Sequence, residues 1–96
     1  MKNQFHFSSD AWNHNNTRLT NQIFKLLPMF ENEEDWDKQL ETIIMEFYGY
    51  NDMFENNPQF MILIAKLHAL RHAEDQIAFR KLVFEAISTL KEISIT

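Results

Sequence analysis

Apolar residues recur along most of the chain at the spacing of amphipathic helices. The most apolar stretch runs from Pro58 to Leu70, and its segment from Phe60 to Ala65 contains no polar side chain. Pro58 follows an asparagine pair and suits the first position of a helix. A helix that is apolar on nearly all sides is usually buried on several of them. This stretch is therefore predicted to be the central helix of a core.

Three further segments carry an apolar stripe with the 3.6-residue helical period. Together with the central helix, the predicted helices are 16–27, 33–54, 58–71 and 75–93. The first is expected to stop at Pro28, because the residue before a proline disfavours helical backbone angles. Asn32 and Asp75 are the predicted caps of the second and fourth helices. The first turn of the second helix is expected to hold three acids that suit the positive end of the helix dipole, Glu33, Glu34 and Asp35.

Residues 1–15 are predicted to form an arm that leads into the first helix. Serines and asparagines in this segment favour helix caps and turns, so the helix is expected to start between Ser9 and Asn16. Trp12 lies seven residues before Leu19, which places both on one helical face. That spacing favours the earlier start.

The small number of glycines and prolines indicates how the helices are connected. One glycine and two prolines in 96 residues favour long helices over many short strands. Connections of a few residues make consecutive helices antiparallel neighbours. The sequence therefore predicts one all-α domain over 1–96, an up-down-up-down four-helix bundle with an N-terminal arm.

Charge is distributed unevenly along the chain. The formal net charge is −5, yet the stretch from Glu31 to Glu55 holds nine acids and a single base, Lys38. Phosphate neutralisation supplies much of the affinity for nucleic acid, so a nucleic-acid-associated regulator is only a minor alternative. The acidic face of the second helix is either solvated or the docking surface for a basic protein partner. Its candidate residues are Glu34, Asp37 and Glu41.

Compartment and membrane contact follow from composition. The sequence has no cysteine, which fits a reducing compartment. The first residues lack the apolar run of a secretory signal. The central apolar stretch is too short to span a bilayer and is interrupted by Lys66 and His68. A cytoplasmic protein without membrane contact is expected.

His68 and His72 lie one helical turn apart, a spacing at which neutral imidazoles can ligate a metal. Asp75 or Glu74 would supply a third ligand. A metal-binding or catalytic helical bundle using His68 and His72 is thus the alternative function. The chain has no His-Glu-x-x-His or Glu-x-x-His signature, so structural histidines and no cofactor are the primary expectation.

The fourth helix carries a second apolar face besides its core stripe. Ile77 and Phe84 fall opposite the stripe, and Ile87 flanks them. Exposed contiguous apolar surface usually marks a contact site, so a two-fold homodimer with Phe84 near the axis is predicted. In the alternative, Phe5 and Phe7 of the arm cover this face within one chain.

The densest aromatic cluster of the sequence runs from Phe47 to Phe54. Most of it is expected to close one end of the bundle. Tyr48 and Met53 point away from the core stripe and are candidate interface residues, because aromatics and methionine are enriched at interfaces. The leading expectation is a small non-enzymatic protein–protein interaction module that self-associates and acts as an adaptor, regulator or inhibitor.

Overall fold

The computed structural model describes residues 9–54 and 57–93, and this part of the chain is helical without any strand. The prediction of an all-α fold is therefore confirmed. The elements in chain order are α1 (Ser9–Phe24), α2 (Leu26–Glu31), α3 (Trp36–Met53), α4 (Pro58–Ala69), the 3₁₀ turn η2 (Leu70–His72) and α5 (Gln76–Glu92).

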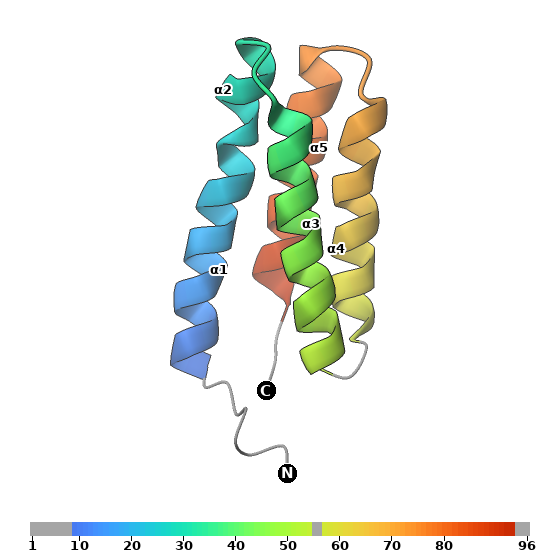
Figure 1. The fold of residues 1–96 in the computed structure, drawn as a ribbon. Helices are drawn as coiled ribbons and strands as arrows, with labels where there is room; N and C mark the ends of the chain where they lie inside the picture. Colours follow the sequence, from blue (N-terminus) through green and yellow to red (C-terminus); the bar gives the residue numbers. More distant parts are fainter. Residues whose placement is uncertain (1–8, 55–56, 94–96) are drawn as a thin grey trace.

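The helices lie side by side around one core (Figure 1). Helix α4 packs against α3 and α5, and α1 packs against α5 and α3, so each long helix has two neighbours. Short α2 continues α1 at the end where α3 begins. Each helix directs its apolar stripe inward, as the periodicity predicts. The largest fully buried side chains of this core are three rings, Phe47, Phe60 and Phe79.

The first helix begins earlier than the predicted range 16–27. Helix α1 starts at Ser9, the early limit of the predicted interval from Ser9 to Asn16, and Trp12 is buried on the apolar stripe as its spacing from Leu19 predicts. The Trp12 ring meets three other rings edge to face, with centroid distances of 5.6 Å to Tyr50, 6.2 Å to Phe54 and 5.6 Å to Phe60. Residues 1–8 of the predicted arm, with Phe5 and Phe7, lie outside the described residues.

The expectation that Pro28 ends the helix is wrong in detail. Helical structure is interrupted at Lys25 and resumes as α2, in which Pro28 is the third residue. A proline lacks the backbone N–H that would bond to the carbonyl of Phe24, four residues earlier. Within the first turn of a new helix that bond is not required. The break before α2 therefore accommodates Pro28.

The second long helix, α3, begins at Trp36, three residues later than predicted. Asn32 is the residue that ends α2, and Glu33 has a positive φ of 57°, which interrupts helical geometry. Asp35 is the cap, and its Oδ1 accepts a hydrogen bond of 3.2 Å from the backbone N–H of Lys38. The three expected first-turn acids thus lie before α3.

The caps of the last two long helices agree with the sequence pattern. The side chain of Asn57 accepts a 2.8 Å bond from the N–H of Gln59, next to Pro58 at the first helical position. Asp75 accepts a 2.8 Å bond from the N–H of Ala78. Each bond satisfies a backbone donor that the helix itself leaves unpaired.

Candidate functional site

The outer side of α5 carries the most exposed large apolar side chain of the described chain. Ile77 is 81% exposed, and Phe84, two helical turns later, is 46% exposed. The Phe84 ring meets the Phe24 ring of α1 at a centroid distance of 5.7 Å and an angle of 74°. We call these three residues, Phe24, Ile77 and Phe84, the α1–α5 patch. The Phe24 ring of α1 therefore covers part of the Phe84 side chain.

Ile87 does not belong to this patch, in contrast to its place among the predicted interface residues. It is only 4% exposed and lies in the core. Helix α1 packs against α5. Asn16 of α1 donates a 3.1 Å hydrogen bond from Nδ2 to the carbonyl of Leu90, which holds the two helices close there.

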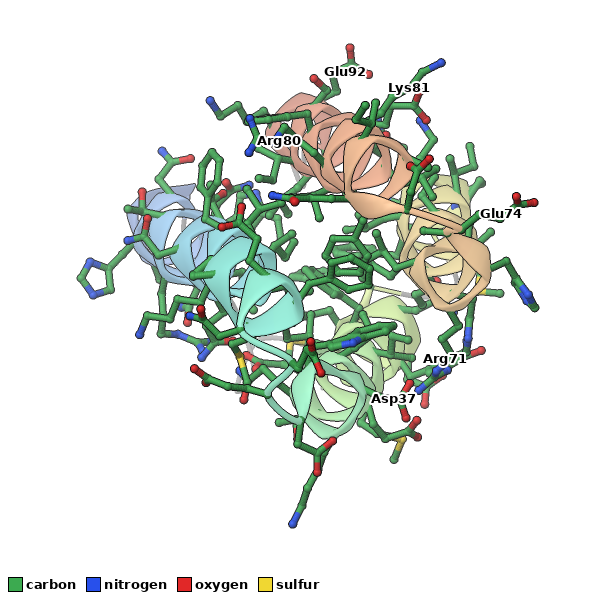
Figure 2. All side chains as sticks on the ribbon, turned by 90° about the horizontal axis from the view of Figure 1, so that it is seen from above. Asp37, Arg71, Glu74, Arg80, Lys81 and Glu92 are labelled. Carbon is green, nitrogen blue, oxygen red and sulfur yellow. The ribbon has the colours of Figure 1, made fainter. Side chains whose placement is uncertain are left out.

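Basic side chains border the α1–α5 patch. Arg80 and Lys81 extend from the outer side of α5 (Figure 2), and Lys25 is exposed at the end of α1. Arg80 forms an ion pair of 3.5 Å with Glu31 of α2, to which the Gln76 side chain also donates. The border is therefore mixed in charge where α2 meets α5.

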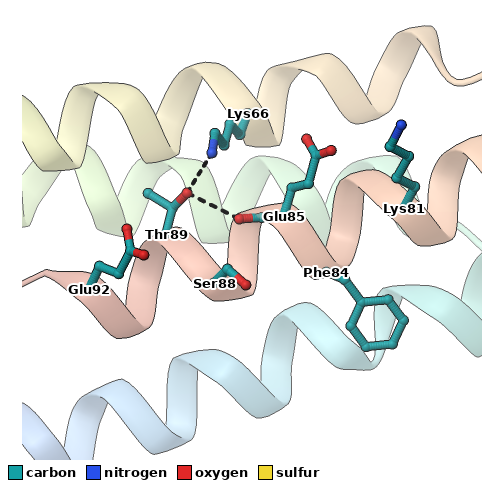
Figure 3. Close-up of a pocket in the computed structure, with 7 residues that line it drawn as sticks. All are labelled: Lys66, Lys81, Phe84, Glu85, Ser88, Thr89 and Glu92. Carbon is teal, nitrogen blue, oxygen red and sulfur yellow. Dashed lines mark hydrogen bonds between the residues drawn. The ribbon is translucent and has the colours of Figure 1, made fainter.

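A shallow groove of about 450 Å³ lies between α4 and α5 (Figure 3). Lys66 of α4 donates a 2.7 Å bond from Nζ to Oγ1 of Thr89, and that hydroxyl donates a 3.0 Å bond to the carbonyl of Glu85. Thr89 is thus engaged in holding α4 against α5. The other lining residues are Lys81, Phe84, Ser88 and Glu92. The groove is lined by two bases, Lys66 and Lys81, and two acids, Glu85 and Glu92, so its formal charges cancel. This balance favours a helix-packing groove over a site that selects one charged ligand.

The candidate metal ligands are not brought together. Arg71 can only donate hydrogen bonds, so the 3.1 Å contact between its Nη1 and Nδ1 of His68 makes that ring nitrogen an acceptor. Asp75 caps α5, and His72 is exposed. Across residues 9–54 and 57–93, no three His, Cys, Asp or Glu side chains are placed to share a metal ion.

Two of the predicted acidic residues share one cation from another helix. Arg71 donates from Nε to Oδ1 of Asp37 at 2.7 Å and from Nη2 to Oε1 of Glu41 at 2.6 Å. These bonds raise the pKa of Arg71, the bond to Asp37 most. Figure 2 shows Asp37 and Arg71 pointing toward one another. Glu34 lies in the connection before α3, so the three acids do not form one helical face.

Tyr48 and Met53 are both exposed, as expected, but they face different ways. They are five residues apart, which separates them by roughly 140° around α3. Met53 lies two turns beyond Glu46, whose carboxylate pairs with Arg18 of α1, so Met53 belongs to the flank toward α1. The inward residues of the aromatic cluster pack together with Trp12 and Phe60.

A three-residue network that the sequence pattern did not indicate joins α1 to α3. Arg18 pairs with Oε2 of Glu46, and the Tyr50 hydroxyl donates to the same oxygen at 3.3 Å. Burial raises the pKa of Tyr50 above its ordinary value of 10.0, and the Glu46 charge raises it further, although Arg18 opposes this. The folded chain therefore disfavours the phenolate.

This raised pKa predicts a loss of stability in alkali. Tyr50 holds its proton more tightly in the folded chain than in the unfolded one, so its contribution to stability is complete below about pH 10 and is lost as the pH rises through the folded pKa. The decline in urea midpoint between about pH 9 and about pH 11 is expected to be smaller in Tyr50→Phe than in wild type. Tyr48→Phe is the matched control, and an equal reduction in that variant would contradict the assignment.

Within the described residues, no helix is long and apolar enough to cross a membrane. Comparison of the chain with protein-family models, curated proteins and solved structures gives no match. The function is therefore argued from the surfaces described above.

Proposed function

We propose that the chain is a cytoplasmic, non-enzymatic protein–protein interaction module, built as an up-down-up-down four-helix bundle, that self-associates as a homodimer. The observation that carries this proposal is the α1–α5 patch, above all the 81% exposure of Ile77. Isolated exposed apolar residues are common on monomers. Here an isoleucine and a pair of contacting phenylalanines lie within about two turns on one face, which favours an interface.

The shape of the patch supports a two-fold contact. Phe24 and Phe84 hold each other edge to face, so association costs little further side-chain entropy at these rings. A self-complementary patch closes most simply around a two-fold axis. With Phe84 near that axis, Ile77 of each chain would cover apolar surface of the other, and water would be released from both.

The test is the oligomeric state of Phe84→Glu. Wild type is expected to be a dimer by light scattering over a concentration series, and Phe84→Glu is expected to dissociate at least about tenfold more readily, because two carboxylates would meet near the axis. Ile62→Glu is the matched control, since Ile62 is also a large apolar residue that is about half-exposed, but it lies on α4. A monomeric wild type would contradict the proposal. So would a Phe84→Glu variant that dimerises as strongly as wild type.

A further inference from the structure

A second apolar surface lies on the opposite part of the bundle, where α3 and α4 pack against each other. Met45 and Tyr48 of α3 are 61% and 40% exposed, and Met61 of α4 is 45% exposed. Only Tyr48 is singled out by the aromatic clustering of the sequence. We call these three residues, Met45, Tyr48 and Met61, the α3–α4 seam.

The ion pairs of Arg71 fix how the two helices are aligned. Because Arg71 reaches both Asp37 and Glu41, the C-terminal end of α4 lies beside the first turns of α3. The two helices run in opposite directions (Figure 1). Met61, ten residues before Arg71, is therefore level with the stretch of α3 that lies about ten residues after Asp37 and Glu41. That stretch contains Tyr48, so Met61 and Tyr48 lie at the same level along the seam.

The α3 side of the seam alternates apolar and acidic residues. The residues that follow one another at intervals of three or four, and so share one face, are Asp37, Glu41, Met45, Tyr48 and Asp52. All five are exposed. Arg71 offsets the charges at one end, whereas Asp52 at the other end lies beyond its reach along the helix. The face therefore combines apolar anchors with a net negative border.

We propose that the α3–α4 seam is the docking site for an amphipathic helix of a partner protein, with an apolar face and a lysine- or arginine-rich flank. A third helix can pack its ridge of side chains against the exposed faces of two packed helices. Methionines suit such a site because their unbranched, polarisable side chains adapt to different partners. Tyr48 adds a rigid contact with a polar tip.

Charge selects this occupant over others. The α3 side of the seam carries Asp37, Glu41 and Asp52 against Arg71, so a basic flank would be attracted and oriented by the seam. The same charge repels the phosphates of nucleic acid and of anionic membranes. A second copy of the chain is the remaining occupant, but under the proposed function it binds through the α1–α5 patch, and a contact between two seams would place acids against acids.

The experiment uses a model peptide as the probe. It has about 14 residues, or four helical turns, with leucines at helical spacing on one face and lysines on the other. A second peptide keeps the leucines and replaces every lysine with glutamate. Binding of both to the full chain is measured by calorimetry, and the contact residues are mapped by NMR shift changes.

The expected result is saturable binding of the lysine peptide, with shift changes centred on Met45, Tyr48 and Met61, and no saturable binding of the glutamate peptide. The double variant Met45→Gln and Met61→Gln is expected to weaken binding at least about tenfold. The matched control is Met53→Gln with Ile62→Gln, which changes the same number of exposed apolar side chains on the same helices, but outside the seam. It is expected to bind as wild type.

Three outcomes would overturn the inference. They are no saturable binding of the lysine peptide, equal binding of the glutamate peptide, and equal weakening in the control variant. Light scattering on the seam variant provides a further check, because loss of the dimer in Met45→Gln with Met61→Gln would identify a second copy as the occupant instead. Peptide binding does not depend on Phe84. A negative peptide result therefore does not bear on the proposed dimer contact, and a monomeric wild type does not bear on peptide binding at the seam.

Discussion

Leu67→Ala is expected to lower the free energy of unfolding by about 2–5 kcal/mol, through the lost transfer energy of the side chain and the cavity that it leaves. Leu67 is fully buried on α4, the helix that packs against both α3 and α5. A cavity at this position removes contacts on more than one side. The midpoint and slope of urea unfolding measure the change.

Ile62→Ala provides the control for this experiment. It also shortens an aliphatic side chain of α4, but one that is half-exposed. Its effect is expected to remain within about 0.5 kcal/mol, as for most surface changes. Equal losses in both variants would mean that α4 is not the centre of the core.

Trp12→Ala is expected to cost about 3–5 kcal/mol. The indole closes one end of the core against Tyr50, Phe54 and Phe60, and edge-to-face pairs of this kind add to the energy of burial. Thermal unfolding followed by helical circular dichroism measures the loss. The cost arises because residues near the start of α1 carry part of the core.

The adjacent residue Asn13 is exposed, so Asn13→Ala serves as the control and is expected to leave stability nearly unchanged. If Trp12→Ala were as mild as Asn13→Ala, the first two turns of α1 would not be docked on the bundle. The comparison thus separates the observed start at Ser9 from the predicted range 16–27.

Much of the fold could be predicted from local signals. Apolar periodicity placed all four long helices, because a helix that buries one face must repeat apolar residues at that period. Asn57 with Pro58, and Asp75, marked two helix starts correctly, since these residues satisfy or omit the backbone donors of a first turn. Such signals depend on a few neighbouring residues only.

The errors occurred where several local signals competed. Between Lys25 and Trp36 the sequence offers a proline, an asparagine and three consecutive acids, and each is compatible with a helix boundary. The chain inserts short α2, places Glu33 at positive φ and uses Asp35 as the cap. Packing of Phe30 against Trp36 and Phe79 accompanies this path, and such tertiary contacts cannot be read from the local sequence.

The surfaces were predictable only in part. Periodicity along α5 identified Ile77 and Phe84 as exposed, but it could not show that Ile87, which flanks them on the helix, is buried in the core. Arg71 and its partners are 30 and 34 residues apart, so their pairing depends on the packing of α3 and α4. The helical spacing of Met45 and Tyr48 on α3 was a usable signal for the seam. The place of Met61 beside them could not be predicted, because it depends on how α3 and α4 are aligned.

Two of the three residues of the α3–α4 seam are methionines, so this surface is sensitive to oxidation. Peroxide converts methionine to its sulfoxide, a polar and stiffer group that no longer suits an apolar contact. Met45 and Met61 are open to such attack, while the buried residues described for this chain include no methionine. Oxidation would therefore change the seam first, while the bundle would stay folded. Methionine sulfoxide reductases would restore the two methionines.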